Sequence, residues 1–123
     1  MIITKVINDR WDEKVNFTDE NDVFVGYDTA EHCCEFADWY VADEVILCTG
    51  ADLVFDLEGY TFDKDYFKSV DNEDYDVKNY AIFRLVKSDH KDLYLHLFNH
   101  HNGHYSHGFE AKVGGEVWQE GML

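Results

Sequence analysis

The sequence contains no proline and few basic residues, and each shortage narrows what the protein can be. Lysine and arginine account for 10 of its 123 residues, against 26 aspartates and glutamates, so the formal net charge is −16. Such a negative potential repels nucleic acid, phosphate ligands and anionic membranes, and it attracts cations and basic protein surfaces. Because proline is absent, glycine must form most of the sharp turns.

Cysteine and long apolar segments are also scarce. The three cysteines, Cys33, Cys34 and Cys48, are an odd number and two are adjacent, which is typical of a reduced protein, so we expect a cytoplasmic location. No apolar run approaches the ~20 residues that a membrane helix needs, and residues 1–6 predict a strand rather than a signal peptide. No nucleophile-elbow, P-loop or dinucleotide-binding motif is present, so the sequence does not predict an enzyme.

The chain nevertheless has the composition of a folded protein. Hydrophobic residues make up 46% of it and aromatic residues 16%, which is enough apolar material for a core despite the charge. At this length we expect one domain, residues 1–123, with no linker or internal repeat.

Alternating apolar residues predict most of the secondary structure. Strands are expected at residues 2–7, at 80–87, and around Val117 and Trp118 after a turn at Gly114-Gly115. Residues 15–18 and 23–28 predict a hairpin around an acidic turn at 19–22. A second hairpin is predicted from 93–100 and 105–113, because Asn102-Gly103 accepts the positive φ angles of a two-residue turn.

Two segments favour other structures. In residues 29–48, Cys33, Ala37, Tyr40 and Val41 recur at helical spacing after a possible cap at Thr29, although an extended segment is the alternative. Residues 60–79 are rich in Asp, Tyr and Phe and are interpreted as a loop with one helical turn. The predicted class is α+β, mainly an antiparallel sheet with one or two short helices.

Six of the seven histidines lie between residues 90 and 107. In the predicted second hairpin His96, His100 and His107 share one face, with diagonal Cβ separations of roughly 7 Å. They could bind Zn or Ni together with a nearby carboxylate. Ordinary packing of histidine among aromatic residues is the alternative, and no metal-binding spacing motif supports the site.

The string His32-Cys33-Cys34-Glu35 is the other conspicuous feature. Its acidic neighbours oppose a reactive thiolate, so we expect at least one of these cysteines to be buried and unreactive. Together with Asn102-Gly103-His104-Tyr105-Ser106, the string resembles a family of small uncharacterised bacteriophage and prophage proteins, over residues 22–41 and 80–113. The family tends to have Tyr where this chain has His104, and residues 42–79 match it poorly. The resemblance implies a phage origin and an α+β fold, and it implies no activity.

Charge and resemblance together favour a non-enzymatic phage accessory protein. Such a protein would inhibit or sequester a host defence or nucleic-acid-binding protein through that protein's basic surface, by mimicking nucleic acid. The candidate acidic runs are residues 9–13, 19–22 and 63–76, and a merely solubilising surface is the alternative. The candidate binding residues are Asp63, Asp65, Asp71, Glu73, Asp74 and Asp76.

Two other functions remain open at this point. One is a metal-binding protein built on the three histidines. The other is a small-ligand binder that uses an aromatic sheet face made of Tyr94, Phe98, Tyr105 and Phe109.

Overall fold

A computed structural model describes residues 1–9, 12–30, 35–47, 55–73, 77–101 and 107–123. These residues form nine strands and no helix. The strands are β1 (Ile2–Asp9), β2 (Asp12–Thr18), β3 (Val23–Asp28), β4 (Glu35–Ala42), β5 (Thr61–Glu73), β6 (Val77–Val86), β7 (Leu93–His101), β8 (Gly108–Val113) and β9 (Glu116–Met122).

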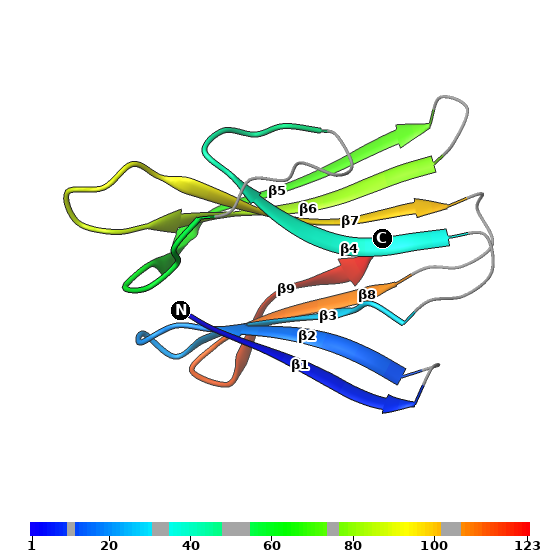
Figure 1. The fold of residues 1–123 in the computed structure, drawn as a ribbon, viewed down its shortest axis with the longest axis horizontal. Coiled ribbons are helices and arrows are strands. Elements are labelled where there is room, and N and C mark those ends of the chain that lie inside the picture. The colour runs from blue at the N-terminus through cyan, green and yellow to red at the C-terminus, as the bar shows by residue number, and fades with distance from the viewer. Residues whose placement is uncertain (10–11, 31–34, 48–54, 74–76, 102–106) are drawn as a thin grey trace.

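The strands pair into two antiparallel sheets that stack as a sandwich (Figure 1). Sheet A has the order β1-β2-β3-β8-β9, and sheet B has the order β4-β7-β6-β5. The core side chains of β2 lie opposite β4, since the rings of Phe17 and Trp39 are 5.0 Å apart at their centroids. Those of β8 lie opposite β5, where Phe67 and Phe109 are 5.8 Å apart. The sandwich therefore has one side edged by β1 and β4 and another edged by β9 and β5.

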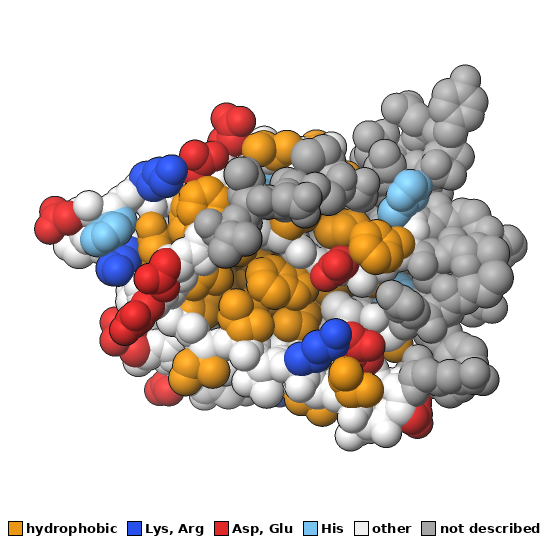
Figure 2. Space-filling model, in the orientation of Figure 1, with side chains coloured by type: hydrophobic (Ala, Val, Ile, Leu, Met, Phe, Trp, Pro, Cys, Tyr) orange, Lys and Arg blue, Asp and Glu red, His pale blue; other side chains and the backbone are white. Residues whose placement is uncertain are grey.

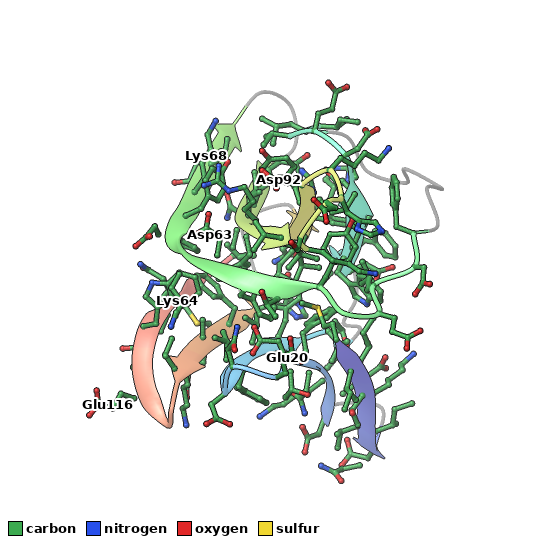
Figure 3. All side chains as sticks on the ribbon, turned by 90° about the vertical axis from the view of Figure 1, so that its left-hand side faces the viewer. Glu20, Asp63, Lys64, Lys68, Asp92 and Glu116 are labelled. Carbon is green, nitrogen blue, oxygen red and sulfur yellow. The ribbon has the colours of Figure 1, made fainter. Side chains whose placement is uncertain are left out.

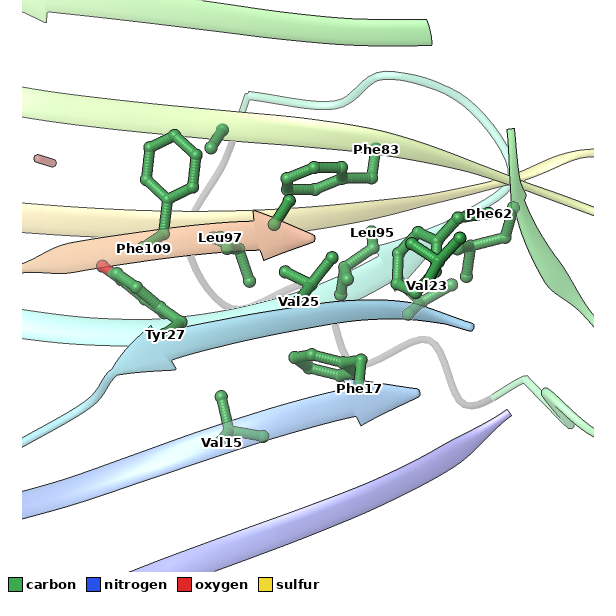
Figure 4. Close-up of a cluster of buried hydrophobic side chains, with 14 of the residues drawn as sticks. Val15, Phe17, Val23, Val25, Tyr27, Phe62, Phe83, Leu95, Leu97 and Phe109 are labelled. Carbon is green, nitrogen blue, oxygen red and sulfur yellow. The ribbon is translucent and has the colours of Figure 1, made fainter. Parts of the chain in front are cut away.

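The core between the sheets follows from strict alternation along the strands (Figure 4). Val23, Val25 and Tyr27 of β3 point inward, and Leu95 and Leu97 of β7 meet them from the other sheet. Each of these side chains is almost completely buried. Complete burial of a side chain of this size contributes roughly 1.5–3 kcal/mol, so the core dominates the stability of the sandwich.

Sheet B is apolar on its second face as well. Tyr40, Tyr80, Ile82 and Phe98 form a smaller cluster there, with Val45 and Ile46 packed against it. The expected strand at 80–87 is confirmed as part of β6, and its apolar residues face both ways because β6 lies between β5 and β7.

The α+β class predicted from the sequence is wrong. Within the predicted helical segment 29–48, the structure has strand β4, which pairs with β7 along its whole length. Ala37 and Val41 face the main core and Tyr40 faces the second cluster. Because both faces of β4 carry buried residues, its apolar positions also match a helical spacing, and periodicity alone could not separate the two structures.

The loop predicted for residues 60–79 is also wrong. Most of this segment is β5, which pairs with β6 from Thr61 to Glu73 with an irregularity between Phe62 and Phe67. β5 is an edge strand of sheet B, so its charged residues can face solvent without breaking the pairing.

The predicted second hairpin has the right strands and the wrong pairing. β7 lies between β4 and β6 in sheet B, whereas β8 lies between β3 and β9 in sheet A. Both edges of β7 are occupied, so β8 has no place beside it, and the chain crosses from one sheet to the other. Asn102-Gly103 lies outside the described residues. The first hairpin, β2 with β3, and the strand after Gly114-Gly115 are confirmed.

Candidate binding surface

The predicted acidic surface on β5 is divided by an internal ion pair. Both Nε and Nη2 of Arg84 donate to Oδ2 of Asp63, at 2.9 and 2.5 Å. The backbone N–H of Asp65 donates to the other carboxylate oxygen of Asp63 at 2.9 Å. These bonds, that from Asp65 first, lower the pKa of Asp63. Asp63 therefore fixes the start of β5 to β6 rather than presenting a free carboxylate.

The remaining predicted residues of this surface do not gather in the described structure. Asp65 and Asp71 are both exposed on β5 and lie six positions apart, with Lys64 directly before Asp65 and Lys68 between the two aspartates. The side chain of Glu73, and all of Asp74 and Asp76, lie outside the described residues. Alternating charges on an exposed edge strand oppose edge-to-edge association, which gives this charge a structural explanation.

A different group of carboxylates gathers at one end of the sandwich. There the β2–β3 turn, the segment before β5, the β6–β7 connection and the start of β9 come together (Figure 3). Each contributes exposed acids, and we call this surface the acidic end. Its residues are Glu20, Asp22, Glu58, Asp89, Asp92 and Glu116.

Lysines also lie on this side of the molecule, among them Lys64 and Lys68 of β5 (Figure 3), but they are fewer than the acids. Lys91 donates to Asp43 at 3.2 Å and lies over the ring of Phe55, and Lys87 lies over the ring of Tyr60. Figure 2 shows red carboxylates grouped with a few blue cations at this end of the molecule, on its left-hand side. The acidic end is therefore a surface of net negative potential presented by several turns.

Asp19 holds these turns in position. Its Oδ1 accepts the N–H groups of Asn21 and Val23, at 2.9 and 3.0 Å, and closes the β2–β3 turn. Its Oδ2 accepts the N–H of Phe62 at 2.8 Å and so joins sheet A to sheet B.

A second bond joins two turns of sheet A, because the N–H of Gly114 donates to the carbonyl of Asp22 at 2.9 Å. Asp22 and Gly114 both have positive φ, near 60°. A hollow of about 340 Å³ lies between these turns, bordered by Asp19, Asp22 and Phe24.

The three candidate metal ligands are not brought together. His96 lies on the outer face of sheet B, stacked on Tyr40 with centroids 4.3 Å apart. His100 follows on the same face of β7, opposite Phe36 and Lys78. His107 faces Tyr27 of sheet A instead, and its Nδ1–H donates to the carbonyl of Asp28 at 2.8 Å. The shared face depended on the second hairpin, and without that pairing the described strands do not put the three rings on one face.

His96 has a structural role that the sequence did not reveal. Its Nδ1–H donates to the carbonyl of Tyr94 at 3.0 Å, and its Nε2 accepts the N–H of Ile46 at 3.2 Å. The hydroxyl of Tyr40 donates to the carbonyl of Ile46. Burial lowers the pKa of His96 to about 4, which keeps the ring neutral. Together His96 and Tyr40 fasten residues 45 and 46 over sheet B.

No group of three or more His, Cys, Asp or Glu that could hold a metal ion is found within the part of the chain that the structure describes. All three cysteines lie outside it, so the expectation that Cys33 or Cys34 is buried stays a prediction. The described segments also contain no helix long and apolar enough to cross a membrane.

The predicted aromatic ligand face is also divided. Phe98 belongs to the outer cluster of sheet B, Phe109 to the main core, and Tyr105 lies outside the described residues. A hollow of about 720 Å³ lies instead on the outer face of sheet A, where the ring of Phe24 lies over Gly26. Of the three predicted aromatic residues that the structure describes, Phe109 alone borders it.

Sequence reasoning found the run 19–22 but missed most of the acidic end. Glu58, Asp89, Asp92 and Glu116 come from three separate parts of the chain, and only the strand topology brings these parts together. One overlooked signal was Arg84, because a guanidinium inside an apolar strand needs a carboxylate partner. Comparisons of the chain with protein-family models, curated proteins and solved structures give no match.

Proposed function

We propose that this chain is a non-enzymatic binding protein whose acidic end occupies a basic surface of another protein. The observation that carries the proposal is that exposed carboxylates from four separate parts of the chain lie on one end of the sandwich (Figure 3). A rigid scaffold that presents acids on short turns is suited to electrostatic recognition.

The partner class follows from the sign of the charge. A surface that attracts this end also attracts nucleic acid, so the partner is a nucleic-acid-binding protein and this chain competes with its natural ligand. The resemblance to phage proteins makes that partner a host protein, a defence nuclease for example, in the bacterial cytoplasm. Inhibition of the host protein is the outcome we propose.

The acidic end, rather than β5, is the surface that we expect to steer binding. The partner is first captured on the immobilised full chain from a nuclease-treated bacterial lysate and identified by mass spectrometry. The variant E20Q/D22N/D92N/E116Q is then expected to slow association about tenfold, because long-range attraction sets the on-rate. Asparagine tolerates the positive φ of Asp22, so the turn is kept.

The matched control, D9N/D65N/D71N/E120Q, removes the same number of charges from exposed positions on β1, β5 and β9 that are not among the acidic-end residues. It is expected to change the on-rate less than threefold, because only the total charge of the chain is then reduced. Equal losses in both variants would show that net charge steers binding without a defined surface. A larger loss of on-rate in the control would indicate that β5, rather than the acidic end, is the binding surface. Binding that ignores both added salt and competing double-stranded DNA would refute the mimicry.

A further inference from the structure

β1 is an edge strand, and no described strand covers its outer side. It pairs only with β2 among the described strands and forms one border of sheet A (Figure 1). All of its residues are exposed, and four of them are large apolar side chains: Ile2 is 68% exposed, Ile3 40%, Val6 36% and Ile7 60%. A strand of this kind presents unpaired backbone groups and apolar side chains to any other strand.

The other sheet shows how this chain protects an edge. β5 carries Asp63, Lys64, Asp65, Lys68 and Asp71 and an irregular pairing, both of which discourage association. Between residues 2 and 8, β1 carries Lys5 alone as a charge, and the ammonium of Lys5 lies 2.9 Å from Glu13. In a chain of net charge −16, this strand is locally neutral and apolar.

We propose that β1 pairs antiparallel with β1 of a second copy of this chain and joins the two copies of sheet A into one continuous sheet. Two identical antiparallel strands are related by a twofold axis perpendicular to the sheet, so opposed residues must point to the same side. Residue numbers that face each other therefore sum to an even number.

One register satisfies the chemistry of the strand. With Thr4 facing Thr4, Ile2 opposes Val6 on the outer face, and Met1 opposes Ile7 on the inner face. Ile3 also opposes Lys5 on the inner face, where the ammonium of Lys5 is paired with Glu13. The apolar cross-strand pairs stabilise the sheet, and no two like charges meet. Centring on Lys5 would oppose two ammonium groups. Centring on Val6 would set Ile3 against Asp9 and would cross the irregularity that follows Ile7.

Charge favours a second copy over a basic partner as the occupant. A basic protein finds no carboxylate between residues 2 and 8, whereas a second β1 is equally neutral and has a matching pattern. The twofold axis also reverses the strand direction, so the two acidic ends point away from each other and their repulsion is small. The inference does not depend on the proposed function.

The test is sedimentation equilibrium of the untagged full chain and of variants at exposed positions. The wild type is expected to dimerise with rising concentration. I2K and V6K are each expected to raise the dimer Kd about tenfold or more, because each places a charge against an apolar side chain twice in the symmetric pair. The double variant I2K/V6E is expected to recover dimerisation, since the introduced ammonium and carboxylate then face each other.

The matched control is V117K on β9, the opposite edge of sheet A, where Val117 is 54% exposed. It makes the same change of charge and is expected to leave the Kd unchanged. Added lysines reduce the net negative charge, so general repulsion cannot explain a lost dimer. Amide exchange in β1 should also slow as the wild-type concentration rises, because pairing protects its outward N–H groups.

Three results would overturn the inference. The wild type could stay monomeric at every concentration, which would show that β1 does not pair with a second copy and would favour a strand of another protein as its partner. V117K could dissociate the dimer while I2K and V6K do not, which would place the interface on β9. I2K/V6E could remain as dissociated as the single variants, which would rule out the register centred on Thr4.

Discussion

Replacing Asp19 by alanine is expected to lower the free energy of unfolding by about 3 kcal/mol, because three backbone N–H groups lose a charged acceptor at once. Two of these bonds close the β2–β3 turn, and the third reaches Phe62 at the start of β5. The loss therefore acts on both sheets. Urea denaturation followed by far-UV circular dichroism measures the change.

The control is Glu20→Ala, which removes the same charge from the next position of the same turn. Glu20 is exposed, so its replacement is expected to change stability by less than about 0.5 kcal/mol. Similar losses in the two variants would mean that the charge of the turn, rather than the bonds of Asp19, matters. Asp19→Asn keeps one acceptor oxygen and is expected to fall between the two.

The contrast between Asp19 and its neighbours shows what the carboxylates of this chain do. The carboxylates of Asp19 and Asp63 accept internal hydrogen bonds that position β5. Each nevertheless lies in a run of acids that the sequence predicts as a binding surface. Glu20, Asp22 and Asp65 from the same runs are exposed. The positions of charges along the sequence cannot separate bonded carboxylates from exposed ones, because the hydrogen-bond partners Phe62 and Arg84 lie far away in the chain.

Local patterns predicted the strands far better than their partners. Residues 2–7, 80–87 and the first hairpin were predicted from period-two alternation and turn residues, and each of these signals is contained in a few neighbouring residues. The pairing of β7 with β4 was not predicted, since it depends on which edges remain free in the assembled sheet. The class was wrong for a related reason: β4 buries both faces and so imitates a helix.

The histidines show how one wrong pairing affects a site prediction. Alternation was enough to assign β7 as a strand, but whether His96 and His107 lie close together depends on the order of the strands in the sheets. Because β8 belongs to sheet A, the two rings have different surroundings. What remains at His96 is a neutral imidazole held by two backbone groups, and that arrangement has a pH dependence of its own.

Lowering the pH from 7.5 to 4 is expected to remove about 3 kcal/mol of the stability that depends on His96. Burial depresses its pKa from 6.5 to about 4 in the folded protein. Between pH 6.5 and about 4 the imidazole is therefore protonated in the unfolded chain and neutral in the folded chain. Stability falls as the pH falls through this range. Its described neighbours Tyr40, Ile82 and Ile46 carry no charge that could compensate.

Protonation of the many carboxylates acts in the opposite direction, because it relieves repulsion in a chain of net charge −16. The measurement is therefore a difference between variants. His96→Phe keeps a ring against Tyr40 but cannot titrate, so the free energy of unfolding of wild type minus variant, from urea denaturation, should decrease by about 3 kcal/mol between pH 7.5 and 4. The matched change His90→Phe, at an exposed position in the β6–β7 connection, should leave the pH profile parallel to that of the wild type.

The acid-induced change should begin at the segment that His96 holds. A protonated Nε2 can no longer accept the N–H of Ile46, so residues 45 and 46 should lose amide protection before β6 and β7 do. Exchange measured at pH 7 and near pH 5 in the wild type and in H96F separates this local opening from global unfolding. If the protection of Ile46 fell equally in both proteins, the opening would have another cause, and His96 would contribute to packing without sensing pH.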